Sequence, residues 1–185
     1  MRLSRPDSAT VEQYLASQRA QPYSYPDSGA SRDDRVPAGF KLDHHRRELG
    51  RGELVFAAAR RAIREWRMFP RWTAIEPHAP IAKDEVVGVI VRVLGLWWLN
   101  AARIVYVIDE ARRFGFAYGT LPGHAERGEE RFSIEWLADD SVVYDIRAFS
   151  RPRHWAARIG YPLTRMLQHR FARDSMAAMA AAVAE

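Results

Sequence analysis

Residues 106–149 contain three runs in which apolar side chains alternate with polar or small ones, and this alternation constrains the fold more than any other feature. The segment reads YVIDEARRFGFAYGTLPGHAERGEERFSIEWLADDSVVYDIRAF. Successive residues of a strand point to opposite faces, so each run predicts a strand with one apolar face. Residues 138–140 are typical of a tight turn and residues 121–128 of a longer loop, as expected for an antiparallel sheet with one covered side.

The apolar positions of these runs are expected to share the concave side of the sheet. In residues 102–109 the same pattern places Tyr106 on one face with its apolar neighbours at positions 104 and 108. In residues 114–119 one face is aromatic and the other is almost bare. The side chains predicted for the concave face of the last three strands are Phe114, Phe116, Tyr118, Phe132, Ile134, Trp136, Tyr144 and Ile146.

Three further strands and three helices are predicted along the chain. The strands cover residues 40–49, 71–77 and 85–94, and the tryptophans of residues 94–100, Trp97 and Trp98, are expected in a connection. A short helix over residues 9–20 has Thr10 as its candidate N-cap, and a second helix over residues 53–66 is expected to stop before Pro70.

The C-terminal region predicts one long amphipathic helix. Ser150 is a candidate N-cap with Pro152 in the first turn, and the main helix is expected to begin near Pro162. A one-faced sheet followed by such a helix predicts an α+β helix-grip fold, in which a curved antiparallel sheet wraps around the helix. We expect residues 1–20 to form a helical extension, residues 21–39 an irregular lead-in, and residues 21–185 the helix-grip domain.

Composition sets the limits of this interpretation. The 185 residues are 48% apolar and include no cysteine, which suits one domain, excludes thiolate chemistry and is compatible with the cytoplasmic location that we expect. No apolar run approaches the length of a spanning helix. The net charge of +5 comes largely from arginines at helical spacing in residues 59–71 and 151–173, which is typical of solvated helix faces. A nucleic-acid partner is the alternative.

Three stretches resemble one known family. They read GFKLDHHRRELGRGELVFAAARRAIREW, RIVYVIDEARRFGFAYGTLPGHAERGEERFSIEW and AFSRPRHWAARIGYPLTRMLQHRF, and the resemblance extends over about residues 21–179. The family is the one catalogued as domain of unknown function nineteen-ninety, which is grouped with the START and birch-pollen-allergen-like superfamily. The resemblance implies a helix-grip fold with two shorter helices and, between sheet and helix, a space that other branches use for hydrophobic ligands or for cyclase and hydrolase chemistry. It supplies no catalytic residues.

Several polar residues are candidates for chemistry. Tyr118, His124 and Glu130 are the first to test as general acids or bases, although acidic residues between strands are more often solvated turn residues, and this reading is favoured for Glu126, Glu129 and Glu130. His44 and His45 point to opposite faces of a strand, and no other set of His, Asp and Glu shows metal-ligand spacing, so we expect no metal site. The glycine-containing segments LGRG and YGTLPG are not phosphate loops, so we expect no cofactor. Three arginines could reach a ligand carboxylate: Arg103, Arg147 and Arg151.

The function predicted from these patterns is the binding of a small hydrophobic or amphipathic molecule between the sheet and the C-terminal helix. An enzyme acting in the same cavity is the alternative, and core packing is the favoured role of the tyrosines themselves. The side chains predicted to contact the ligand are Tyr106, Phe114, Phe116, Tyr118, Phe132, Ile134, Trp136, Tyr144, Ile146, Met166 and Phe171.

Overall fold

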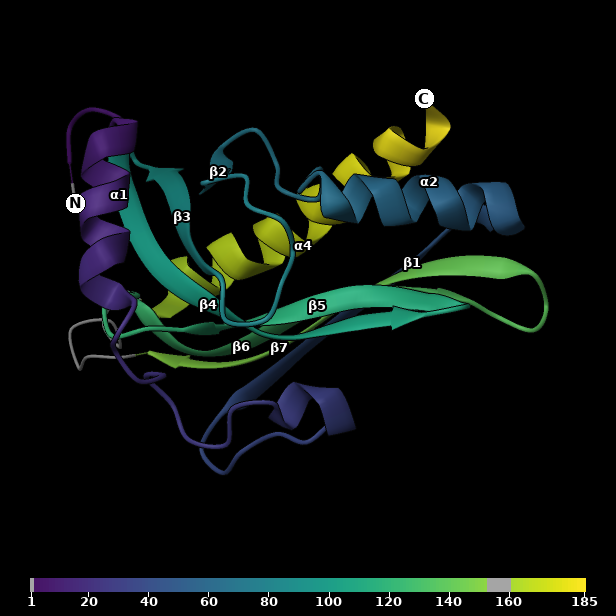
Figure 1. Ribbon diagram of the computed structural model, residues 1–185, viewed down its shortest axis with the longest axis horizontal. Coiled ribbons are helices and arrows are strands. Elements are labelled where there is room, and N and C mark those ends of the chain that lie inside the picture. Colours follow the sequence, from purple (N-terminus) through teal and green to yellow (C-terminus); the bar gives the residue numbers. More distant parts are fainter. Residues whose placement is uncertain (1, 153–160) are drawn as a thin grey trace.

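A computed structural model describes residues 2–152 and 161–185, and its centre is one seven-stranded antiparallel sheet (Figure 1). The strand order is β1-β7-β6-β5-β4-β3-β2. The elements in chain order are α1 (Ser8–Gln18), the 3-10 helix η1 (Ala30–Asp33), β1 (Lys41–Arg51), α2 (Glu53–Arg64), β2 (Thr73–Glu76), β3 (Val86–Val93), β4 (Leu96–Glu110), β5 (Arg113–Thr120), β6 (Glu126–Trp136), β7 (Ser141–Pro152) and α4 (Tyr161–Ala184). The predicted helix-grip architecture, a curved sheet around a long C-terminal helix, is confirmed.

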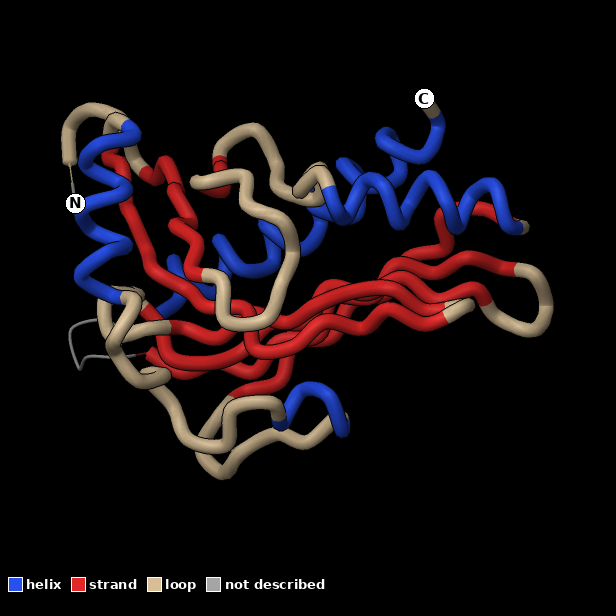
Figure 2. The backbone as a smooth tube through the Cα atoms, viewed as in Figure 1, coloured by secondary structure: helices blue, strands red, loops and turns tan. Residues whose placement is uncertain are grey.

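The two faces of the sheet are covered by different parts of the chain. Figures 1 and 2 show α2 and α4 on the concave face, and η1 with the chain around it on the opposite, convex face. Helix α1 lies at one end of the molecule, where Val11 and Leu15 pack with Val86 and Ile90 of β3. Its N-cap is Asp7, whose side chain accepts a hydrogen bond from the Thr10 backbone, so the prediction of Thr10 as N-cap was wrong.

The main core fills the concave side. Phe116 and Phe132 of neighbouring strands stack there with ring centroids 5.5 Å apart, and both side chains are fully buried. Met176 and Met179, in the second half of α4, belong to the same cluster of buried side chains. The alternation in the sequence therefore predicts the core face of β5 and β6 correctly.

The face of β5 that carries only small residues leaves room for the chain that packs on it. A side chain at Gly119 would collide with the Tyr25 hydroxyl, because Tyr25 crosses the convex face at that point. Tyr25 is buried and its ring contacts Phe149 edge-on at 5.6 Å. Residues 21–39, predicted as an irregular lead-in, thus pack on the sheet through the space that small residues leave.

Two predictions for β4 were wrong, each for a local reason. Trp97 and Trp98 lie within β4, because Leu94 and Gly95 both take positive φ angles (51° and 78°) and connect β3 to β4 as a tight hairpin. Tyr106 lies on the convex face rather than the concave one, because a register irregularity between Ile104 and Tyr106 reverses the alternation. Its hydroxyl is 2.6 Å from that of Ser31 in η1.

The predicted helix boundaries are also corrected. Ser150 and Pro152 belong to β7 rather than to a helix start, whereas the main helix does begin next to Pro162. Residues 153–160 lie outside the described part of the chain. Helix α2 ends at Arg64, before the predicted stop at Pro70, and Trp66 follows it with a φ of 58°.

Candidate functional site

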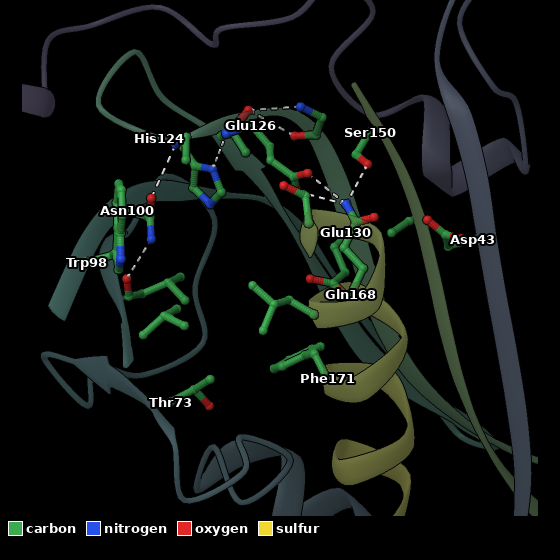
Figure 3. A pocket seen from close by; sticks show the side chains of 18 of the residues that line it. Asp43, Thr73, Trp98, Asn100, His124, Glu126, Glu130, Ser150, Gln168 and Phe171 are labelled. Carbon is green, nitrogen blue, oxygen red and sulfur yellow. Dashed lines mark hydrogen bonds between the residues drawn. The ribbon is translucent and has the colours of Figure 1, made fainter. Parts of the chain in front are cut away.

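A cavity of about 490 Å³ lies between the concave face of the sheet and the first half of α4 (Figure 3). It exists because α4 contacts the core mainly through its second half, where Met176 and Met179 are buried, whereas Leu163 and Met166 nearer its start are 37% and 57% exposed. Most of the wall is apolar. It includes Val89, Val91, Leu96, Trp98, Leu167 and Phe171.

One end of the cavity is polar. Glu126 and Glu130 reach it from β6, since they share the concave face of that strand with Phe132. Gln168 of α4 donates hydrogen bonds from Nε2 to both carboxylate oxygens of Glu126, at 2.8 and 2.9 Å, and to Ser150 Oγ at 3.1 Å. These bonds join α4 to β6 and β7 at the polar end.

Glu130 and Tyr118 form a pair inside the cavity. The Tyr118 hydroxyl donates to Glu130 Oε2 at 2.7 Å. Burial raises the pKa of the Glu130 carboxyl to about 7, and burial with the nearby Glu130 raises the pKa of Tyr118 well above its usual value. Burial also raises the pKa of Glu126. A carboxyl group with a pKa near neutrality can both give and take a proton at physiological pH.

His124 lines the cavity from the loop between β5 and β6. Its Nδ1 accepts a hydrogen bond from the Glu126 backbone at 3.1 Å, which leaves Nε2 as the position for a proton on the neutral ring. Asn100 Oδ1 accepts from the Ala125 backbone at 3.2 Å, and Tyr14 Oη donates to the Gly123 carbonyl at 2.6 Å. The loop is therefore held on both sides.

One group of described residues has the composition of a metal site. Ligand atoms of Asp43, His45 and His169 lie within 4.8 Å of one another. The guanidinium of Arg165 already lies among them: it donates to both Asp43 oxygens, and its Nη2 is 3.1 Å from His169 Nε2. A metal ion could bind there only if the Arg165 side chain moved away.

Residues 24–178 match a family model described as Domain of unknown function (DUF1990). The chain belongs to this family. It is 33% identical to a UPF0548 protein of Dictyostelium discoideum over 97% of this chain and 94% of the relative, and 38% identical to a UPF0548 protein of Deinococcus radiodurans over 92% of each. Among solved structures, the Zhui aromatase/cyclase from Streptomyces sp. R1128 aligns with a TM-score of 0.56 at 12% identity, over 78% of this chain and 93% of that one. This last likeness shows a common fold.

The residues matched by the DUF1990 model include those at the polar end of the cavity. In the structure, the residues predicted for the site fall into three groups. Five line the cavity: Tyr118, His124, Glu130, Ile146 and Phe171. Five others belong to the buried core: Phe114, Phe116, Phe132, Ile134 and Tyr144. These five side chains pack in the main core on the concave side of the sheet, next to the cavity.

Three predicted ligand contacts lie elsewhere. Tyr106 is on the convex face, for the reason given above. Trp136 packs against Phe56 at a ring distance of 6.1 Å, at the end of β6 remote from Glu126. Met166 is 57% exposed, because the helical stripe to which it was assigned turns partly away from the sheet.

Glu126 was missed as a cavity residue, and Glu130 was predicted only as a residue to test for catalysis, although the sequence contains a signal that places both in the cavity. Glu126 and Glu130 continue the alternation of Phe132 backwards, which places them on the concave face. They were interpreted as solvated turn residues because β6 was expected to begin later. The role of Gln168 has no comparable signal, since nothing in the helical pattern distinguishes it from a surface glutamine.

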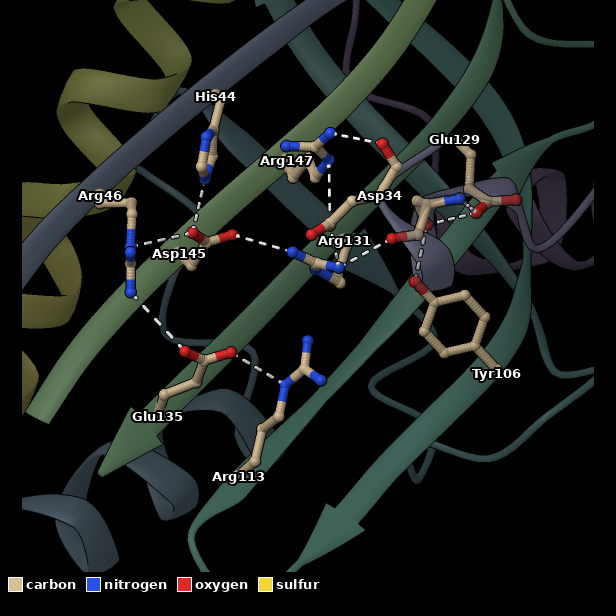
Figure 4. A network of polar contacts seen from close by, with 11 residues as sticks. Asp34, His44, Arg46, Tyr106, Arg113, Glu129, Arg131, Glu135, Asp145 and Arg147 are labelled. Atoms are coloured by element: carbon tan, nitrogen blue, oxygen red, sulfur yellow. Dashed lines mark hydrogen bonds and ion pairs between the residues drawn. The ribbon is translucent and has the colours of Figure 1, made fainter. Parts of the chain in front are cut away.

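Glu129, also interpreted as a turn residue, points to the convex face and is buried (Figure 4). It accepts hydrogen bonds from the Tyr25 hydroxyl at 2.6 Å, from the Ser31 hydroxyl, and from the Ser31 backbone at 3.0 Å. Arg131 next to it donates to the Ser31 carbonyl at 2.7 Å and lies 3.4 Å from Asp145. This network holds residues 21–39 on the sheet.

The arginines that were candidates for a ligand carboxylate bind other groups. Arg103 donates to the carbonyls of residues 19 and 21 at 2.6 and 2.9 Å, and Arg147 donates to the Asp34 carbonyl at 2.7 Å. Asp34, at the end of η1, also lies 3.2 Å from Arg147 Nε. Arg151 lies over the Phe40 ring at 4.7 Å.

Many of the other arginines form ion pairs on the surface of the described part of the chain. Arg60 and Arg64 share Asp109, and Arg170 and Arg173 share Asp174.

None of the helices in residues 2–152 and 161–185 is long and apolar enough to cross a membrane.

Proposed function

We propose that this protein binds a small amphipathic molecule in the cavity between the sheet and the first half of α4. The observation that carries the proposal is the cavity itself: about 490 Å³ in volume, with apolar walls and a few polar groups gathered at one end. Ligand sites typically have a volume of about 300–1,000 Å³ and this division between apolar lining and orienting polar groups. The fold that this chain shares with the Zhui aromatase/cyclase is compatible with such a role.

In this proposal the apolar body of the ligand lies against β3, β4 and α4, in contact with side chains such as Val91, Leu167 and Phe171. The polar group of the ligand points towards Glu126 and Glu130. Burial of the body supplies most of the affinity, because each Å² of apolar surface removed from water contributes about 25 cal/mol. The polar end selects the orientation.

A cavity-filling variant tests the proposal. Leu167→Trp is expected to occupy part of the cavity, whereas Met166→Trp, its neighbour on α4, places the same ring at a largely exposed position. Titration of the neutral probe N-phenyl-1-naphthylamine should give saturable fluorescence with the wild type and with Met166→Trp, and a much weaker response with Leu167→Trp. Absence of saturable binding by the wild type, or equal binding by both variants, would overturn the proposal.

Enzymatic general acid and base chemistry in the same cavity is the second candidate, and the Tyr118–Glu130 pair favours it. Glu130→Gln keeps the shape of the side chain and removes its proton transfer. Small-molecule extract from the producing cells should be incubated with the wild type and with this variant, and then compared by mass spectrometry. Conversion by the wild type alone would support an enzyme, and identical spectra would argue against one.

A further inference from the structure

We infer that the ligand is an amphipathic organic cation, a protonated amine on an apolar body, whose ammonium group lies between Glu126 and Glu130. This inference rests on the proposed function and specifies the ligand class of the same cavity. It is carried by the way in which charge is compensated at the polar end of the cavity, compared with the rest of the sheet.

The two carboxylates have neutral partners. Glu130 accepts from the Tyr118 hydroxyl, and Glu126 accepts from the Gln168 amide. Within residues 2–152 and 161–185, no arginine, lysine or histidine forms an ion pair with either carboxylate. Arg165, the cation that acts on Glu126 from nearby, is engaged by both oxygens of Asp43.

The opposite face of β6 shows how this chain treats the carboxylates that it uses for structure. Glu135 lies 3.0 Å from Arg113, and Glu129 is surrounded by hydroxyl and backbone donors of residues 25–31. Arg127 also lines the cavity, but it alternates with Glu126 along β6 and forms no ion pair with either carboxylate within the described residues. Glu135 thus has a cation as its partner and Glu129 accepts four hydrogen bonds, whereas in the cavity Glu130 accepts one and Glu126 two.

The hydrogen-bonding capacity at this end matches an ammonium group. An ionised carboxylate offers about four acceptor positions, and a primary ammonium brings three donors and no acceptor. Glu130 uses one of its positions for Tyr118, and Glu126 uses two for Gln168, so both retain acceptors for a donor inside the cavity. A carboxylate ligand, by contrast, would bring only acceptors and a second negative charge.

The electrostatics point in the same direction. Burial raises the pKa of both glutamates, so the empty cavity disfavours their ionised forms. A cation between them would stabilise the ionised forms and replace the water that burial removes. An anion would force at least one of them to take up a proton. The candidate anion anchors, Arg103, Arg147 and Arg151, are bound elsewhere in the fold.

Three ligands with the same ten-carbon chain and different head groups test the inference: decylamine, decanol and decanoate. Their affinities should be measured by isothermal titration calorimetry at about pH 8, where an alkylamine is still protonated. Decylamine is expected to bind at least about tenfold more tightly than decanol, the factor that about 1.4 kcal/mol gives, and decanoate should bind most weakly. Decanoate binding as tightly as decylamine would overturn the inference, with or without any variant.

Variants then test which residues produce the preference for decylamine over decanol. The double variant Glu126→Gln, Glu130→Gln keeps the side-chain shapes, and it should bind decanol while losing the preference for decylamine. Glu135→Gln, on the convex face of the same strand, should keep the preference. A preference that survives in the double variant would refute the role of the two glutamates. Binding of decanol without any gain for decylamine would refute the inference and leave the proposed function intact, and absence of binding by all three ligands would refute both.

Discussion

Replacing Glu130 by Gln should change how the stability of the empty protein depends on pH. The pKa of this carboxyl rises from 4.5 to about 7 in the folded protein, mainly through burial, while the Tyr118 hydrogen bond opposes the rise. Because the folded state binds the proton more tightly than the unfolded state, the contribution of Glu130 is most favourable below about pH 4.5 and is lost as the pH rises to about 7. Above that pH the loss is constant.

The magnitude follows from the same values. A rise from 4.5 to about 7 corresponds to a loss of roughly 3 kcal/mol, since a tenfold change in an ionisation constant corresponds to about 1.4 kcal/mol. Gln resembles the protonated carboxyl in shape and has no charge to bury. The variant should therefore be similar to the wild type in stability near pH 4.5 and more stable than it by up to about 3 kcal/mol at pH 8.

Urea unfolding at a series of pH values between about 4.5 and 8 measures this difference, with fluorescence of the tryptophans as the signal. Glu126 has a raised pKa and changes stability in the same direction, whereas His45 has a pKa lowered by burial and stabilises the protein as the pH rises. Both remain in the variant, so subtracting the two curves removes the contribution of His45 and leaves that of Glu130 together with its coupling to Glu126. Glu135→Gln is the matched control. Parallel curves for the wild type and Glu130→Gln would refute the argument that burial in the cavity controls this carboxyl.

Three further predictions concern the core and the convex face. Phe116→Ala should lower the free energy of unfolding by about 3–5 kcal/mol, since the side chain is fully buried, and a loss below about 1 kcal/mol in urea unfolding would contradict its place in the core. Glu129→Ala should leave the Tyr25 hydroxyl and nearby backbone donors without their acceptor, so amide hydrogen exchange of residues 29–31 should rise well before that of β6. Unchanged exchange would contradict this. Tyr144→Phe removes the 3.0 Å hydrogen bond to Ser175 and should cost about 1 kcal/mol in thermal or urea unfolding, and no loss would show that this bond is not needed.

The sequence predicts the parts of the fold in which a regular pattern continues without interruption. The aromatic alternation in β5 places its side chains correctly, and the apolar pattern of α4 does so in the second half of the helix but not at Met166. Errors occur where the backbone departs from regularity. The irregularity before Tyr106 reverses one face of β4, and the turn at Leu94 and Gly95 extends the hairpin to Trp97. Neither irregularity alters the order of apolar and polar residues in the sequence, so the alternation pattern alone does not reveal it.

The cavity is harder to predict than the fold because it depends on what α4 leaves unfilled. An alternating strand tells which residues face the helix, but the distance between sheet and helix depends on packing along the whole length of α4. Glu130 also contradicts the simple expectation that an inward face is apolar, and for that reason its run was interpreted as a turn. An acidic residue that continues an apolar face into a predicted loop is the signal to look for.

β6 itself contains the comparison that bears most directly on function. On its convex side, Arg131 and Glu135 form ion pairs, and Glu129 accepts four hydrogen bonds from hydroxyl and backbone groups. On its concave side, Glu126 and Glu130 face a cavity with raised pKa values and neutral partners. A carboxyl group whose pKa is raised by burial lowers the stability of the folded protein when it is ionised. The two carboxylates therefore reduce the stability of the empty protein at the place where a ligand would bind, and a bound cation is the partner that would reverse this effect.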